Sequence, residues 1–279
     1  MKLKTIRKGR EIPPKYTLLI TYCRPWMFDK LAEWVNRIDL PLETTKEIEL
    51  IFLWDGKTKG ENIKHYFAIW EWLELMGDVL GFNGIKFVIT EQDPLDEKDR
   101  VSARRKRIIS LLEEVKPFIG NSKIFMQLED DSLPGYDAFK KLLKTFKTEH
   151  AGFVQAIEAG RHIKHAGAWK IDNVEDPQTI ETLPYKESGI EEIQGGGFYC
   201  YVTRTELFKK AEFRATAECL GVDVNFVLDI VRQGYKAFVD WGVVCGHYQK
   251  NGKIILPDAK MPVLKWRKAG DNYRQCFGK

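Results

Sequence analysis

The sequence predicts an α/β protein whose open, mixed and mostly parallel sheet is flanked by helices. The first observation is that short apolar runs alternate with longer stretches in which apolar residues recur at helical spacing. The second is that the alternation gives the order β-α-β-α-β-α-β-α, which is typical of parallel strands joined by crossover helices. The third is that polar residues directly follow the apolar runs, at the edge where such sheets bind ligands.

The first half of the chain supplies the regular part of this fold. Residues 16–21 (YTLLIT) and 48–54 (IELIFLW) are continuous apolar runs, as expected of strands buried on both faces. Two further strands are predicted at residues 85–90 and 124–128. Helical spacing predicts helices at residues 27–38, 61–80, 101–115 and 136–146, with an acidic loop at residues 91–99.

The second half has a less regular pattern. Strands are predicted at residues 151–157, 198–202 and 235–245, and helices at residues 205–211 and 222–233. Residues 158–188 are rich in charged and turn-forming residues, which predicts a long loop. We expect a single domain over residues 16–248, with residues 1–15 as a basic leader and residues 249–279 as a basic tail.

Composition narrows the class of protein. The chain has 279 residues, of which 44% are hydrophobic and 30% charged, as in soluble globular proteins. Its apolar runs are far shorter than the roughly 20 residues of a membrane span, and residues 1–15 lack the apolar segment of a signal peptide. Five scattered cysteines favour a reducing compartment. These features predict a cytoplasmic protein without a transmembrane segment.

Charge is distributed unevenly along the chain. Residues 1–15 carry a net charge of +5 and residues 248–279 carry +6, which leaves −7 for the rest of a chain whose total is +4. An acidic body with basic ends fits an internal metal site and an anionic partner at the ends. Basic ends that only aid solubility would give the same pattern.

Three consecutive carboxylates, Glu129, Asp130 and Asp131, follow the predicted strand at residues 124–128. Acids in a row repel one another, so a sheet cannot bury them without partners. At the end of a strand they can share a divalent cation and, through it, a polyphosphate. The alternative is a solvated turn, because Asp, Ser and Pro also favour turns.

Other polar residues fall at predicted strand ends or helix starts. The loop at residues 22–24 follows the first strand, Asp55 follows the second and His247 follows the last. Arg104 and Arg105 lie early in a predicted helix, where the helix dipole favours phosphate. Each also has a structural interpretation, namely a turn residue, a buried histidine or a solvated helix face.

Motifs at residues 21–24, 54–56 and 102–105 resemble, in type and in order, those of GT-A-fold glycosyltransferases, and most closely the inverting family 2 enzymes. Residues 21–24 (TYCR) are similar to a Thr-Tyr-Asn-Arg turn after the first strand of that family. Residues 54–56 (WDG) are similar to its Asp-Asp-Gly turn after the second strand. Residues 102–105 (SARR) are similar to an Ala-Arg-Asn element that opens a helix.

The resemblance extends to the later motifs. Residues 129–131 (EDD) are similar to the DXD-type metal motif of the family. Residues 222–223 (VD) align with the pair that holds the catalytic base, and His247 aligns with a histidine that completes metal binding. Together the motifs span residues 16–248 and imply a nucleotide-binding half (16–134) followed by an acceptor-binding half (135–248).

The resemblance implies an inverting glycosyltransferase that moves a hexosyl or related group from a nucleoside-diphosphate sugar, first of all a UDP-sugar, to an acceptor hydroxyl. The residues implied for donor and nucleotide binding are Thr21, Tyr22, Arg24, Asp55, Arg104, Arg105 and Asp130. A divalent cation, Mn²⁺ or Mg²⁺, is expected at Asp131, Glu129 and His247, and the catalytic base at Asp223. Gly195, Gly196 and Gly197 are expected to let the backbone approach the donor sugar or acceptor, although a flexible turn would have the same composition.

Two other functions remain open from the sequence. A nucleotidyltransferase also combines an α/β sheet with a carboxylate-held metal, but usually has a glycine-rich loop where this chain has residues 22–25 (YCRP). A nucleic-acid-binding protein could use the basic ends, with Trp266 and Tyr273 as stacking groups. The glycosyltransferase and nucleic-acid-binding functions would be combined in one protein if the sugar acceptor is a modified nucleic-acid base.

Overall fold

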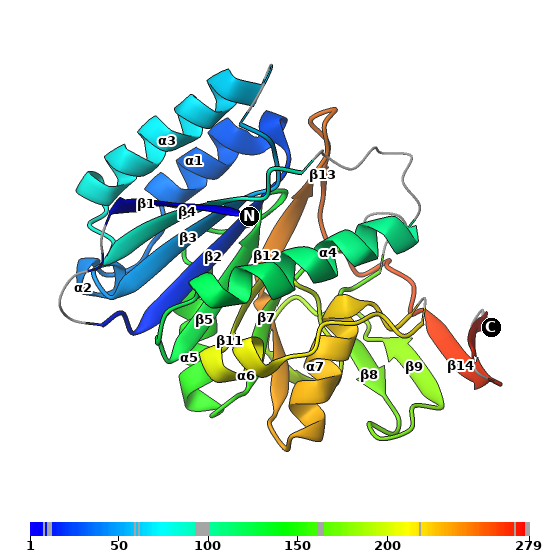
Figure 1. The fold of residues 1–279 in the computed structure, drawn as a ribbon. Coiled ribbons are helices and arrows are strands. Elements are labelled where there is room, and N and C mark those ends of the chain that lie inside the picture. Colours follow the sequence, from blue (N-terminus) through cyan, green and yellow to red (C-terminus); the bar gives the residue numbers. More distant parts are fainter. Residues whose placement is uncertain are drawn as a thin grey trace. The chain divides into compact units, whose positions relative to one another are not determined.

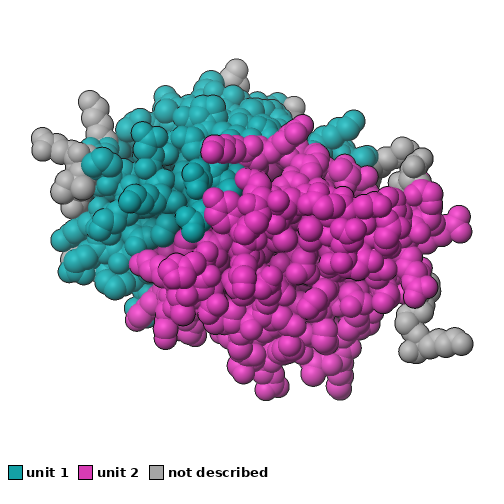
Figure 2. Space-filling view, turned by 90° about the horizontal axis from the view of Figure 1, so that it is seen from below, with its two compact units in different colours: residues 1–131, 204–209 teal, residues 132–203, 210–279 magenta. Residues whose placement is uncertain are grey.

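A computed structural model describes residues 1–7, 9, 13–58, 60, 62–92, 101–160, 165–217, 219–270 and 272–276. The chain divides into two compact units, shown in separate colours in Figure 2. Unit 1 comprises Met1–Asp131 and Arg204–Lys209, and unit 2 comprises Ser132–Thr203 and Lys210–Lys279. Most of the predicted acidic loop at residues 91–99 lies outside the described residues.

Unit 1 is built on parallel strands. In spatial order its strands are β1 (Lys2–Arg7), β4 (Gly84–Ile89), β3 (Ile48–Trp54), β2 (Tyr16–Tyr22) and β5 (Ile124–Glu129) (Figure 1). Strands β2 to β5 run parallel to their neighbours, whereas β1 pairs with β4 in the antiparallel direction. Every residue of β3 is buried, as the continuous apolar run predicts for a strand covered on both faces.

The helices of unit 1 cover these strands. They are η1 (Pro25–Met27), α1 (Phe28–Asn36), α2 (Leu42–Thr45), α3 (Asn62–Val79), α4 (Val101–Val115), η2 (Lys116–Phe118) and most of α6 (Thr205–Lys210). Helices α1 and α3 lie side by side (Figure 1), where Phe28 and Trp72 meet edge to face. Helix α6 comes from much later in the chain, and its Phe208 stacks on Phe125 of β5 with ring centroids 4.0 Å apart.

Unit 2 contains mainly antiparallel strands. Its first set has the order β11 (Cys200–Arg204), β7 (Phe153–Ile157), β12 (Ala237–Tyr248) and β10 (Ile190–Ile193), and β6 (Ser132–Pro134) and β13 (Ile254–Ile255) also pair with β12. Within this set β7 and β12 are parallel, and the other described pairs are antiparallel. The unit also holds helices α5 (Ala138–Thr148) and α7 (Val222–Arg232).

A second, smaller sheet belongs to unit 2. Its strands have the order β15 (Asn272–Cys276), β14 (Lys265–Ala269), β9 (Thr179–Thr182) and β8 (Trp169–Ile171), and all pairs are antiparallel. Trp169, Ile171 and Ile180 on one face join Val224 and Leu228 of α7 in a buried apolar cluster. This sheet therefore has one face in the core.

The predicted fold class is confirmed, because the chain is an α/β protein with mixed strands and a parallel part flanked by helices. Three segments for which no strand was predicted contain strands in the structure. The leader at residues 1–15 contains β1, the loop at residues 158–188 contains β8 and β9, and the tail at residues 249–279 contains β13, β14 and β15. These strands are short or carry charged residues on an exposed face, so they have no apolar run.

The division of the chain is close to the predicted boundary between the two halves. The prediction placed it after residue 134, and the structure places it after Asp131. The prediction did not include the return of Arg204–Lys209 to unit 1. Among the described helices, none combines the length and the apolar character that crossing a membrane requires.

Candidate functional site

The acids after β5 lie beside the loop that follows β2. These strands are parallel neighbours in which Thr21 pairs with Glu129, so their carboxyl ends meet at one edge of unit 1. The backbone N–H of Asp130 continues this pairing by donating to the carbonyl of Thr21 at 3.1 Å. The Thr21 hydroxyl donates to the carbonyl of Leu128 at 3.4 Å. The structure thus brings together residues that the sequence predicted at one edge.

Asp130 holds the loop at residues 22–24 in place. Its carboxylate accepts the backbone N–H of Cys23 at 2.8 Å, the backbone N–H of Arg24 at 2.7 Å and a guanidinium N–H of Arg24. Burial raises the pKa of Asp130, which is 1% exposed, and the charge of Arg24 and the two backbone donors oppose that rise. Both carboxylate oxygens are therefore used within the protein.

Asp131 shares the same guanidinium. Its Oδ2 lies 3.0 Å from Nε of Arg24, and the side chain is 1% exposed. Burial lowers the pKa of Arg24, but Asp130 and Asp131 outweigh this effect and raise it. Glu129 is partly exposed at the end of β5 and adds to the negative charge around Arg24. Arg24 is thus the counterion of the acidic cluster.

Asp55 is held by a different arginine. Its backbone N–H donates to the carbonyl of Tyr22 at 2.8 Å, which ties the ends of β2 and β3. Its carboxylate accepts the Thr90 hydroxyl at 2.9 Å, Nε of Arg107 at 3.1 Å and a second N–H of Arg107. Arg107 was not among the predicted site residues, although it follows Arg104 by three residues and so lies on the same side of α4.

Arg104 and Arg105 are partly buried residues in the first two turns of α4. Their position in the helix agrees with the prediction. The partner of Asp55 is nevertheless Arg107, one turn further along. Arg107 therefore fixes the end of β3, whereas the role of Arg104 and Arg105 in phosphate binding stays a prediction.

The ring of Tyr22 lies in the core of unit 1. It packs against Phe28 and Phe52, and its hydroxyl hydrogen-bonds Nε2 of His65. Burial raises the pKa of Tyr22, whose side chain is 1% exposed. The buried ring offers no face for stacking, and the predicted role of Tyr22 in nucleotide binding stays a prediction. Its part in the site is to fix the start of the loop.

In unit 2, the glycine triplet is held by buried polar side chains. Oε1 of Gln155 accepts the backbone N–H of Gly197 at 2.8 Å, and Nε2 of Gln155 donates to the carbonyl of Gly167 at 2.6 Å. A Cβ on Gly196 would collide with Gln155, and a Cβ on Gly197 would collide with the ring of Tyr199. Gly196 and Gly197 are closely packed inside unit 2, and the predicted role of the triplet stays a prediction.

His247 lies inside β12, and the prediction that it follows the last strand was wrong. Its neighbours in the sheet are Ser132 of β6 and Ile255 of β13. Nδ1 of His247 lies 2.6 Å from Oε1 of Glu158, and both side chains are buried. Glu158 was not predicted as a site residue, since no sequence pattern links it to His247. The two buried side chains are therefore in contact.

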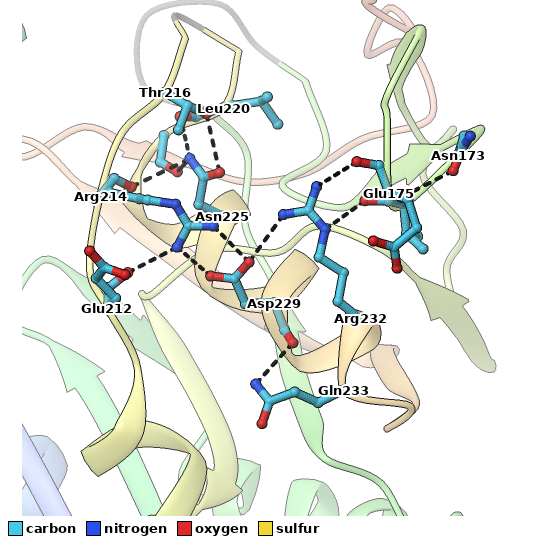
Figure 3. Close-up of polar contacts among 12 residues, drawn as sticks. Asn173, Glu175, Glu212, Arg214, Thr216, Leu220, Asn225, Asp229, Arg232 and Gln233 are labelled. Carbon is cyan, nitrogen blue, oxygen red and sulfur yellow. Dashed lines mark hydrogen bonds and ion pairs between the residues drawn. The ribbon is translucent and has the colours of Figure 1, made fainter.

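Asp223 lies in the first turn of α7 and is partly exposed. Its Oδ1 accepts the backbone N–H of Val224 at 2.9 Å. Helix α7 is anchored along its length, as Figure 3 shows: the Asn225 amide donates to the carbonyl of Leu220 at 2.8 Å, and Asp229 forms ion pairs with Arg214 and Arg232. Asp223 therefore sits on a rigid element, as a catalytic group requires.

The donor chemistry of the acidic cluster fits a divalent cation. Carboxylate oxygens suit Mg²⁺ and Mn²⁺, and Asp131 and Glu129 supply them at the end of β5. Among the described residues, no three His, Cys, Asp or Glu side chains are grouped as ligands for a metal ion. A cation bound by one or two carboxylates together with substrate phosphates needs no such group.

Comparison with known proteins identifies the fold. No protein-family model matches the chain, and no curated protein matches its sequence. GalNAc-T7, solved with UDP, GalNAc and Mn²⁺, has a TM-score of 0.57 and 10% identity over 87% of this chain and 45% of that chain. The mannosyltransferase PcManGT from Pyrobaculum calidifontis, solved with GDP-Man and Mn²⁺, has a TM-score of 0.48 and 14% identity over 87% and 59%.

A UDP-glucose pyrophosphorylase has a TM-score of 0.46 and 10% identity over 82% of this chain and 90% of that chain. This chain spans about half the length of the two transferases, with 45% and 59% of their residues covered. The similarity to GalNAc-T7 concerns the fold alone, since the sequences are 10% identical. The resemblance predicted from the motifs is confirmed at this level: the chain has the fold of the GT-A glycosyltransferases.

Proposed function

We propose that the protein is a metal-dependent, inverting glycosyltransferase that moves a sugar from a nucleoside-diphosphate sugar to an acceptor hydroxyl. A fold does not determine a function, so the proposal rests on the site. The observation that carries it is the buried pair Asp130 and Asp131, directly after a parallel strand and beside the loop after the neighbouring strand. A UDP-sugar is the first donor to test.

The residues of unit 1 are proposed to bind the donor. Asp130 and Asp55 fix the ends of β2, β3 and β5, so that the neighbouring backbone forms a rigid floor for the nucleotide. Arg104 and Arg105 are proposed phosphate contacts near the start of α4, where the helix dipole favours anions. Asp131, with Glu129, is proposed to bind Mn²⁺ or Mg²⁺, which when bound neutralises charge on the leaving diphosphate.

The residues of unit 2 are proposed to act on the acceptor. Asp223 would take the proton of the acceptor hydroxyl while that oxygen attacks the anomeric carbon and the bond from this carbon to the diphosphate oxygen breaks. His247 is proposed as a further metal ligand, held in orientation by Glu158. Gly195, Gly196 and Gly197 are proposed to line the path of the donor sugar or acceptor, with Gln155 fixing their backbone.

The first experiment is a thermal-shift screen of nucleoside diphosphates and nucleotide-sugars with and without Mn²⁺. We expect a rise in Tm that requires both components, because each stabilises the folded state by binding to it. Asp131→Asn should remove the Mn²⁺-dependent part of the shift. The matched control is Asp78→Asn, whose carboxylate is 89% exposed, and it should keep that part. Equal shifts in the two variants would contradict the proposal.

The second experiment separates binding from chemistry. Asp223→Asn should keep the thermal shift and lower the rate of sugar transfer by about 10²–10⁴-fold, the usual contribution of a general base. An unchanged rate would place the base elsewhere. Release of pyrophosphate from a nucleoside triphosphate and a sugar phosphate, without transfer to a hydroxyl, would instead identify a nucleotidyltransferase.

A further inference from the structure

The small sheet of unit 2 has a basic outer face. Successive residues of a strand point to opposite faces, so the residues between those in the apolar cluster point away from it. The charged residues of this outer face are Lys170 of β8, Glu181 of β9, Lys265 and Arg267 of β14 and Arg274 of β15. Among the described residues of these strands, the face thus holds four cations and one carboxylate.

Two of these cations face each other directly. Arg267 pairs with Arg274 in the register of β14 and β15, and both are exposed. Side chains in this relation stand about 5 Å apart, and like charges there destabilise the sheet. The carboxylate of Glu181 is taken by Lys265 at 3.1 Å. Over the part of the chain that the structure describes, no carboxylate pairs with Arg267 or Arg274.

The aromatic residues of the same strands are directed away from this face. Trp266 and Tyr273 pack against the apolar cluster, and the Tyr273 hydroxyl donates to the carbonyl of Pro177 at 2.8 Å. These two rings therefore do not belong to the outer face, and their predicted role as stacking groups stays a prediction. In the described strands, the outer face therefore carries mainly cationic side chains and no aromatic ring.

We infer that this outer face binds the phosphate backbone of a nucleic acid. Uncompensated cations on one face of a sheet suit a polymer with regularly spaced anions, and phosphate contacts need no base readout. A lipid surface is the less suitable partner, because binding to it combines cations with apolar side chains that insert, and the charged outer face has no large apolar residue in its described strands. The binding is independent of base sequence.

The test is fluorescence anisotropy of a labelled DNA duplex of about 20 base pairs, titrated at several NaCl concentrations. With about three phosphate contacts, affinity should fall about fortyfold between about 50 and about 200 mM NaCl. Arg267→Glu/Arg274→Glu should weaken binding by at least about tenfold and flatten the salt dependence. The assay uses neither a nucleotide-sugar nor a metal ion, so its result is independent of the proposed transferase activity.

The matched control is Lys64→Glu/Lys144→Glu, which changes the net charge equally at exposed positions of α3 and α5. It should bind the duplex within about twofold of the unaltered protein. Arg274→Glu alone places opposite charges across the strand pair, so it should weaken binding without lowering Tm, and it decides the question if the double variant does not fold.

Three results would overturn the inference. The first is equal loss of affinity in the Arg267/Arg274 variant and in the lysine control. The second is the absence of duplex binding at the lowest salt concentration. The third is binding to phosphatidylserine vesicles without binding to the duplex, which would make an acidic membrane the partner of this face.

Discussion

Unit 1 and unit 2 place their charged residues in different ways. In unit 1 the parallel strands are buried on both faces, so the carboxylates of Asp55, Asp130 and Asp131 stand at strand ends and each is held by an arginine. In unit 2 the small antiparallel sheet has one face in the core, so charged residues such as Arg267 occupy the strands themselves. Sheet type therefore determines whether charge is buried and paired or exposed and available to a partner.

The variant with the largest expected effect tests whether helix α6, which comes late in the chain, belongs to the core of unit 1. Phe208→Ala should lower the free energy of unfolding by about 4 kcal/mol, because it removes a fully buried ring stacked on Phe125. Urea denaturation measures the change. The control Phe67→Ala removes a ring that is 53% exposed in the same unit and should have an effect of less than about 1 kcal/mol. Similar losses of unfolding free energy in both variants would contradict the inclusion of α6 in the core of unit 1.

The next effect tests the buried charge of unit 1. Asp130→Asn should lower the free energy of unfolding by about 3 kcal/mol, since it breaks a buried ion pair and leaves Arg24 with less compensation. Asp78→Asn, at an exposed carboxylate of the same unit, should change it by less than about 0.5 kcal/mol. Chemical denaturation measures the stability of both variants. Equal stabilities would contradict the role of Asp130 in anchoring the loop at residues 22–24.

The smallest effect compares the two faces of the small sheet. Trp266→Ala should destabilise unit 2 by about 2 kcal/mol because the ring packs on the apolar cluster. The adjacent Arg267→Ala should change stability by less than about 0.5 kcal/mol, since its side chain is exposed and faces another arginine. Thermal and urea unfolding would show the contrast, and a larger loss in Arg267→Ala would reverse the assignment of the two faces.

The sequence predicted the parallel part of the fold well for a physical reason. A strand buried on both faces is mostly apolar, and β2 (YTLLITY) and β3 (IELIFLW) fit this pattern with few polar residues. Strands β9 (TIET) and β14 (KWRKA) each hold one large apolar residue among polar or charged ones, and they are 4 and 5 residues long. Their pairing joins residues 179–181 to residues 265–267, and local patterns carry no information about such distant partners.

The candidate site shows the same limit. That the acids after β5 and the loop after β2 share one edge follows from the parallel order of the strands, so the proximity of Arg24 and Asp130 was predictable. The choice of Arg107 over Arg104 for Asp55 depends on how far along the axis of α4 each residue lies relative to Asp55, because both are on the same side of the helix and sequence spacing does not fix that position. The contact of Glu158 with His247 depends on the register between β7 and β12.

The discontinuous make-up of unit 1 has a consequence for its synthesis. At about 5–20 residues per second, a ribosome needs about 4–14 s to add the 72 residues of Ser132–Thr203 that separate β5 from α6. Throughout that interval Phe125 lacks the ring that later covers it. Unit 1 therefore cannot finish folding before about half of unit 2 has been synthesised, and a nascent chain stalled between Phe125 and Phe208 would expose an apolar surface to chaperones.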